Sequence, residues 1–173
     1  SVLGRLARAR ALVDALADPD VNVRHAAATS LGQIGSPEAV PRLVEALRGE
    51  PWLQYPALHA LGEIGDPRAA PALVPLLEQE LLRSPALEAL GRVGGRECLA
   101  AIVPFLLDPD PELRNRAIRA VVEIEQRATS SGDSLDPQVH GPGAARPAHL
   151  HTKAELIVGD VRDRNAVARA LDG

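Results

Sequence analysis

The chain has 173 residues, a length that fits one domain of ordinary size or a domain with a tail. Phe, Tyr and Trp occur once each among many Ala, Leu and Val residues, so the core must be aliphatic and closely packed. The formal net charge of -4 lies within residues 1–126, which carry 13 Arg against 17 Asp and Glu. This acidic balance argues against a nucleic-acid partner, because affinity for polyphosphates comes largely from basic residues that displace counterions.

Cysteine content and hydropathy exclude two further classes. The single Cys98 cannot form an intrachain disulfide framework. The sequence has neither an apolar run long enough to span a membrane nor a signal-peptide core, which predicts a cytoplasmic protein without a membrane partner. Met is absent throughout, which favours a fragment or a processed chain.

The first predicted helix covers Ser1 to Ala17, and a helical hairpin follows at residues 21–50. In the first half of the hairpin, apolar residues recur at helical spacing up to Ile34, and Gly35 then provides a helix stop. Ser36 and Pro37 suit the start of a second helix. The apolar face of that second helix consists of Val40, Leu43, Val44 and Leu47, and the residues pointing away from it are Glu38, Arg42, Glu45 and Arg48.

This hairpin recurs along the chain. LGQIG at residues 31–35 returns as LGEIG at 61–65 and as LGRVG at 90–94, so the second spacing is one position shorter than the first. Leu12 and Leu16 match the second helix, whereas the segment from Pro111 to about Arg127 matches the first. The pattern therefore predicts a lone second helix, three full hairpins and a lone first helix, which must stack to bury their apolar faces. The lone first helix would leave part of its apolar face in water unless the tail or another chain covers that face. The residues of this face are Ala117, Ile118, Val121, Val122 and Ile124.

Three local features carry structural expectations. Asp20 is placed to cap a helix and to meet Arg24 one turn on. Gly32, Gly62 and Gly91 lie inside helical patterns, which predicts that a neighbouring helix approaches closely there. Prolines interrupt the second helices in mid-helix, where each removes a backbone hydrogen bond and should kink the axis, at Pro75 and Pro104.

The motif D-x-x-V-R-x-x-A-A-x-x-L-G-x-I-G-x-P-x-A-V-P-x-L, nearly whole from Asp20 to Leu43, resembles the short HEAT-like repeat of bilin lyase subunits and many bacterial proteins. The resemblance covers about residues 1–126. It implies an all-α fold, a right-handed α-solenoid of stacked helical hairpins, here with a partly disordered C-terminal tail. It also implies that the outward row of the second helices lines a concave surface.

The expected partner is a protein or peptide bound on that concave surface. Its floor would be shallow and apolar around Pro75 and Pro104, which suits a partner helix or an extended peptide. Trp52 and Tyr55 open the second copy and are typical interface anchors, although a lone Trp also serves as a core gap-filler, and the prolines also serve to tune curvature. The partner-binding candidates are Arg42, Glu45, Trp52, Tyr55, Pro75, Pro104 and Leu107.

The repeat pattern ends before the tail. Residues 127–152 have the composition of a flexible linker, and residues 153–173 contain a short strand-like run and a helical spacing. Together with residues 133–141 they resemble an internal section of NAD-dependent epimerases and dehydratases. In that family three positions contact the adenosine of the cofactor. The residues of this chain that match them are Asp133, Asp160 and Val161. The glycine-rich turn and the Y-x-x-x-K pair of that family are missing, so we expect no working nucleotide site.

The leading hypothesis is a non-catalytic scaffold without cofactor or metal, because no cluster of nucleophile, base or metal ligands is evident. His25 and His59 are each followed by Ala, and imidazoles without neighbouring carboxylates make a weak iron site. The alternatives are an accessory subunit of a bilin lyase-type modifying enzyme and a regulatory module of an epimerase fusion. Oligomeric state is left open.

Overall fold

The computed structural model describes residues 2–130. The chain divides into two units, Ser1–Arg127 and Ala128–Gly173, and the described residues are the first unit and the end of its last helix. The predictions for the linker, the epimerase-like segment and the three nucleotide-contact positions lie outside the described residues. Helices without strands make up residues 2–130, which confirms the all-α class.

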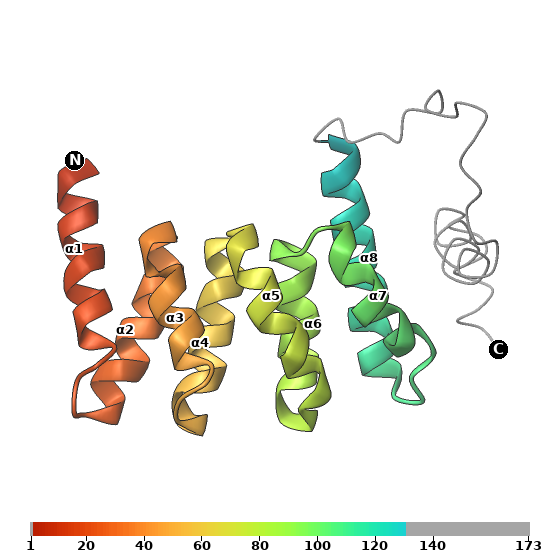
Figure 1. Cartoon of the computed structure of the whole chain (residues 1–173), viewed down its shortest axis with the longest axis horizontal. Coiled ribbons are helices and arrows are strands. Elements are labelled where there is room, and N and C mark those ends of the chain that lie inside the picture. Colours follow the sequence, from red (N-terminus) through yellow and green to blue (C-terminus); the bar gives the residue numbers. More distant parts are fainter. Residues whose placement is uncertain (1, 131–173) are drawn as a thin grey trace, which may run out of the picture. The chain divides into compact units, whose positions relative to one another are not determined.

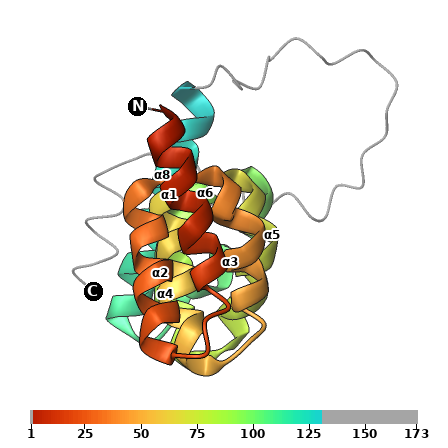
Figure 2. The same ribbon diagram turned by 90° about the vertical axis from the view of Figure 1, so that its left-hand side faces the viewer.

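Two sets of helices alternate along the chain (Figure 1). The first helices of the repeat are α2 (Val21–Ile34), α4 (Pro51–Ile64), α6 (Glu80–Val93) and α8 (Pro111–Ser130). The first of the second helices is α1 (Val2–Ala15). Each later second helix consists of consecutive shorter segments. These are η1 (Pro37–Ala39) with α3 (Val40–Ala46); then η2 (Pro67–Ala69), α5 (Ala70–Leu73) and η3 (Val74–Glu78); and finally η4 (Arg96–Cys98), α7 (Leu99–Ile102) and η5 (Val103–Leu107). Seen along the row in Figure 2, α2 and α4 lie in one layer and α3 and α5 in the other.

The core lies between the two layers and is aliphatic, as composition predicts. The repeated leucine of the first helices is fully buried in all three copies, at Leu31, Leu61 and Leu90, and Val121 takes the same place in α8. The matching position of the second helices is also fully buried, at Leu43, Leu73 and Ile102. Burying one such side chain contributes about 1.5–3 kcal/mol, so this periodic set specifies the stacking of the hairpins.

Local signals fix where the first helices begin and end. The Asp20 side chain accepts a hydrogen bond from the Asn22 amide, and Gly35 and Gly65 end α2 and α4 with φ of 66° and 73°, a region that favours glycine. Arg24 does not follow the expected geometry with Asp20. Its guanidinium donates to the carbonyls of Asp18 and Pro19 at 2.7 and 3.1 Å and pairs with Glu50.

The Arg24 contact belongs to a repeated device. At the equivalent position of each later first helix, a long polar side chain donates to a carbonyl at the end of the preceding second helix or its turn. Gln54 reaches Leu47 O at 3.0 Å, Arg83 reaches Leu77 O at 2.9 Å, and Arg114 reaches Asp108 O at 2.8 Å. These bonds satisfy carbonyls that a helix end leaves without a partner, and they tie each second helix to the first helix that follows it.

The helices accordingly pair differently from what the motif indicates, because a second helix packs more closely against the first helix that follows it than against the one that precedes it. The α1 helix packs against α2, α3 packs against α4, and η3 packs against α6. The last first helix has a partner in the same way, because Arg114 joins α8 to the turn that follows η5. Grouped by these contacts, residues 2–130 form four helical pairs.

The expectation that α8 leaves its apolar face in water is therefore wrong for the central residues. Ala117, Val121 and Ile124 are buried, whereas Ile118 and Val122 are half-buried. Arg127 also donates to the carbonyls of Arg92 and Gly94 at the end of α6. The preceding pair of helices thus covers α8 along much of its length.

The glycines inside the first helices mark the closest helix contacts, as predicted. A Cβ at Gly32 would lie 2.9 Å from Ala60 Cα, and one at Gly91 would lie 3.0 Å from Ala120 Cα. At Gly62 the same distance, to Ala89 Cα, is 3.3 Å. Each glycine thus faces an alanine of the next first helix, which lets neighbouring backbones approach more closely than larger side chains would allow.

The prolines of the second helices coincide with a change of helix type. In copy one, Glu45 lies within the α-helix Val40–Ala46. In the next two copies Pro75 and Pro104 occupy its place, and each lies at the start of a 3-10 segment that replaces the end of the α-helix. Proline lacks the N–H for the i to i−4 bond and clashes with that carbonyl, so the chain tightens to the i to i−3 pattern.

Candidate protein-interaction surfaces

The outward row of the second helices is exposed in every copy. Arg42 and Glu45 form an exposed ion pair at 2.9 Å in copy one. Pro75 and Pro104 are exposed at the position of Glu45, and Leu107 at the end of η5 is 81% exposed. The row therefore changes along the chain from a charged pair to apolar residues. A surface pair of this kind contributes at most about 1 kcal/mol to stability.

Trp52 and Tyr55 belong to a different surface, at the turn where α3 leads into α4. Trp52 is 74% exposed and Tyr55 is 56% exposed, so neither residue fills the core. Both line an open groove of about 720 Å³ at the adjoining ends of α2 and α4, together with Val21, Asn22, Arg24, His25, Glu50, Pro51 and Pro56. The structure thus separates these two aromatic residues from Arg42, Glu45, Pro75 and Pro104.

One exposed residue escaped the sequence reasoning. Leu81 is 91% exposed in the first turn of α6, and it occupies the same repeat position as Trp52 in the copy before it. An alignment of the copies with one another could have identified Leu81, because the equivalent residue of the first copy is the polar Asn22. An apolar side chain at a position that is polar elsewhere in a repeat indicates a surface role rather than a core role.

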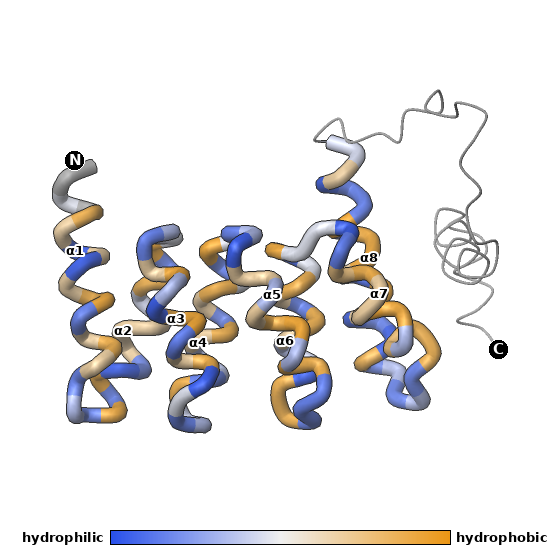
Figure 3. The backbone as a smooth tube through the Cα atoms, viewed as in Figure 1, coloured by the Kyte–Doolittle hydropathy of each residue, from blue (hydrophilic) through white to orange (hydrophobic). Residues whose placement is uncertain are grey.

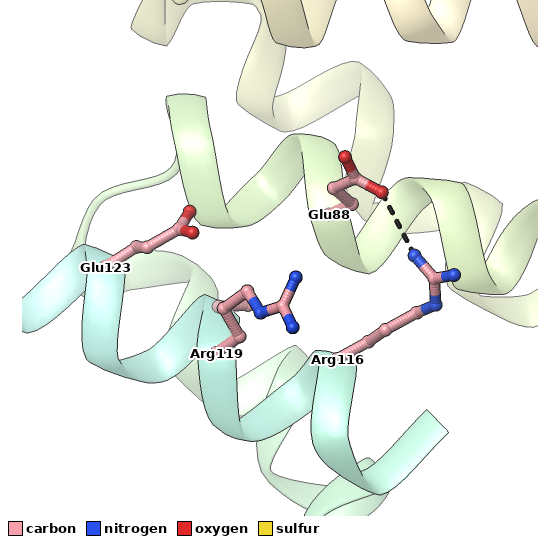
Figure 4. A pocket seen from close by; sticks show the side chains of 5 residues that line it. Glu88, Arg116, Arg119 and Glu123 are labelled. Carbon is pink, nitrogen blue, oxygen red and sulfur yellow. Dashed lines mark hydrogen bonds and ion pairs between the residues drawn. The ribbon is translucent and has the colours of Figure 1, made fainter. Parts of the chain in front are cut away.

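A cluster of charged side chains lies between α6 and α8 (Figure 4). Arg116 pairs with Glu88 at 3.0 Å, and Glu88 also pairs with Arg92 at 3.0 Å. The pocket that Glu88, Arg116, Arg119, Ala120 and Glu123 line has a volume of about 10 Å³, which is about enough for one water molecule. The cluster therefore ties two helices together and is too small to hold a substrate.

Within residues 2–130 we find no reactive centre. Cys98 is buried, and burial together with the neighbouring Glu97 carboxylate raises the pKa of its thiol, which disfavours the thiolate that a nucleophile requires. His59 Nδ1 lies 3.7 Å from Glu63 one turn away. The same residues contain no group of three or more His, Cys, Asp or Glu side chains placed to hold a metal ion.

The hydropathy of the helices bears on whether any of them could cross a membrane. Among the helices described here, none has a stretch that is both long and apolar enough to span a lipid bilayer. Figure 3 shows the reason, because hydrophobic and hydrophilic residues alternate along each helix of the row.

Comparison with known proteins identifies the class. Residues 9–84 match the family model for HEAT repeats. The structure is similar to a chain from the complex of CpcE and CpcF of phycocyanin lyase from Nostoc sp. PCC7120, with a TM-score of 0.61 and 28% identity over 73% of this chain. No match was found among curated proteins. Residues 9–84 therefore consist of HEAT repeats, and the described part of the chain is similar to short HEAT-like repeat proteins.

Two engineered proteins also resemble this chain. One has a TM-score of 0.53 and 25% identity over 68% of this chain, and the other has 0.50 and 26% over 67%. The present chain spans 56% of the length of the phycocyanin lyase chain and 62% and 37% of the engineered ones. All three likenesses therefore concern part of a longer molecule.

Proposed function

We propose that this chain is a non-catalytic scaffold that binds a protein or peptide on the face formed by its second helices. HEAT repeats commonly serve as protein-interaction scaffolds, which supports this general role. The HEAT resemblance makes the second-helix face the concave one. The binding residues would be Arg42, Glu45, Pro75, Pro104 and Leu107.

The observation that carries the proposal is the exposed apolar end of this row. Pro75, Pro104 and Leu107 are exposed, while the core beneath them is already complete with Leu73, Ile102 and Leu106. Proline has no rotamer entropy to lose on binding, so apolar contacts with it are gained at low entropic cost. The Arg42–Glu45 pair at the other end provides polar contacts that orient a bound segment.

Selection of peptides from a random displayed library tests this proposal. Peptides enriched on the native chain should bind Pro104→Asp at least tenfold more weakly, because the change places a charge in an apolar contact. Asn115→Asp is the matched control, since it also adds one carboxylate and Asn115 is exposed on a first helix, and it should leave binding unchanged. Enriched peptides that bind all three proteins equally would contradict the second-helix surface, and so would a selection that yields no saturable binder.

A second candidate function is an accessory role in a bilin lyase-type enzyme. It is favoured by the similarity to the phycocyanin lyase structure, which is a complex of two different chains, CpcE and CpcF. Mixing the chain with phycocyanobilin and an apo-phycobiliprotein tests it, with bilin transfer seen as a change in visible absorbance. We expect no such change from this chain alone, and a change would favour the accessory role over the scaffold.

A further inference from the structure

The turns that lead from second to first helices form one edge of the row of helices, and this edge carries exposed apolar side chains. Each of the four helical pairs contributes at least one such side chain, and four of them are Val21 at 41% exposure, Trp52 at 74%, Leu81 at 91% and Leu107 at 81%. Leu107 thus lies where this edge meets the second-helix face. We call these four residues the apolar edge.

The apolar edge is surrounded by carboxylates. Exposed acidic residues lie in the same turns and in the first turns of the first helices, namely Asp20, Glu50, Glu78, Glu80, Asp110 and Glu112. Asp20 and Asp110 accept hydrogen bonds from the amides of Asn22 and Glu112, which occupies donors of those helix N-termini. The edge therefore presents carboxylate charge rather than free amide donors.

The arginines in the first turns of the first helices are directed inward, whereas Arg48 in the turn before α4 is exposed. Arg24 and Arg114 donate to turn carbonyls, and Arg83 donates to Leu77 O with its guanidinium 5.5 Å from the centre of the Phe105 ring. The turn carbonyls and an aromatic ring thus engage these cations. The surface charge near the apolar edge is consequently negative, although the helical unit contains 13 Arg up to residue 126.

We propose that the apolar edge binds an amphipathic helix whose polar side is rich in Lys or Arg. Apolar side chains of the bound helix would contact Trp52, Leu81 and the groove at Val21 and Tyr55, and its basic residues would pair with the surrounding carboxylates. Val21, Trp52, Tyr55 and Leu81 are not among the residues of the second-helix face, and Leu107 is the one residue that the two surfaces share, so the inference does not depend on the proposed function. Charge complementarity selects a basic partner over an acidic one.

The repeat spacing defines the pattern of the partner. Packed helices lie about 8–10 Å apart, and a helix rises about 1.5 Å per residue, so equivalent positions on neighbouring pairs are about five to seven residues apart on a helix that runs along the edge. The partner should therefore carry apolar residues at i and i+7, with further ones at i+3 or i+4. Contact with three pairs requires about 14–20 residues.

The single tryptophan reports on this surface directly, because Trp52 is the only one in the chain. The probe is a synthetic amphipathic peptide within that range of length, with Leu on one face and Lys on the other and without Trp or Tyr. It should shift the Trp52 emission to the blue in a saturable manner, and raising NaCl should weaken binding. A peptide with Glu in place of Lys, and a Lys peptide with the same composition in scrambled order, should each bind at least tenfold more weakly.

Variants locate the binding. Leu81→Glu changes a side chain that is 91% exposed, so folding should persist, and it should weaken binding of the Leu–Lys peptide at least tenfold. Pro104→Asp, on the second-helix face, should leave this binding unchanged. Equal binding of the Lys and Glu peptides, or unchanged binding to Leu81→Glu, would overturn the proposal. A Trp52 shift with phosphatidylserine vesicles but not with the peptide would also overturn it, in favour of a lipid surface.

Discussion

At the residue scale, the spacing of the first helices depends on paired small residues. Gly32, Gly62 and Gly91 each face an alanine of the next helix, and the distance available to a new Cβ differs among them. Glycine costs about 1 kcal/mol relative to alanine in a helix, so these positions retain it against local preference. The close approach that glycine permits is the compensating gain.

This geometry predicts a graded response to alanine. Gly32→Ala should lower the free energy of unfolding by about 1–3 kcal/mol, because its Cβ would lie 2.9 Å from backbone and the helices must shift. Gly62→Ala should change it by less than about 1 kcal/mol, since 3.3 Å leaves a smaller adjustment that the gain in helix propensity offsets. Urea unfolding followed by circular dichroism measures both.

Two further variants complete that experiment. Gly62→Leu should destabilise more than Gly62→Ala, because a large side chain forces the two pairs apart. Gly49 is exposed with no contact closer than 3.4 Å for a new Cβ, so Gly49→Ala serves as the control and should be nearly neutral. Greater stability of Gly32→Ala than of the native chain would show that the helices do not require glycine.

At the element scale, proline sets the helix type of each second helix. Copy one, with Glu45, keeps an α-helix to Ala46, whereas Pro75 and Pro104 begin 3-10 segments in copies two and three. Among the three copies, which also differ at other positions, the 3-10 segment occurs in the two that carry proline. The sequence identified the prolines but not the form of the distortion.

Exchanging proline and glutamate between the copies should change the helix type in both directions. Pro75→Glu restores an N–H one turn after Pro71, so the residue 75 amide should become protected from hydrogen exchange and helical circular dichroism should rise slightly. Stability should increase, by up to about 3 kcal/mol, if the full cost of the proline is recovered. The reverse change, Glu45→Pro, should destabilise copy one. An unprotected amide at residue 75 would mean that packing, rather than proline, imposes the 3-10 turn.

At the scale of the whole helical unit, each pair contacts only its neighbours. The α4 helix packs between α2 and α6, whereas α1 packs against α2 and η1. In such linear arrays stability is approximately a sum of local and nearest-neighbour terms, so opening is easiest where a helix has few packed neighbours. The row should accordingly have a gradient of stability along its length.

Native-state hydrogen exchange should reveal this gradient. Amides of α4, where Leu58 and Leu61 are fully buried, should exchange at least about 100-fold more slowly than those of α1 after correction for intrinsic rates. Mass spectrometry at two protein concentrations provides the control, because self-association at the α1 end would protect α1 in a concentration-dependent way. Equal protection of α1 and α4 at low concentration would contradict the nearest-neighbour picture.

Periodic residues made much of the fold predictable. The repeated leucines, the glycine stops and the Asp caps each act within one or two turns, so a short repeated motif indicates them without tertiary information. The resemblance to HEAT-like repeats followed from the same residues, and the family match over residues 9–84 confirms it. All seven candidate binding residues are exposed, although the sequence left open whether Trp52 fills the core, and their binding role stays a prediction.

Other features could not be inferred, because they depend on which elements meet in space. Sequence order places Gly35 in the middle of a hairpin, yet contacts between layers pair each second helix with the first helix after it. The Arg24 and Glu50 side chains are far apart in sequence, and only the stacking of α2 beside α4 brings them together. Likewise, Val21, Trp52, Leu81 and Leu107 lie far apart in the sequence, and no local motif connects them. Local patterning determined the helices and their buried faces, whereas the packing of one pair on the next decided which exposed side chains share a surface.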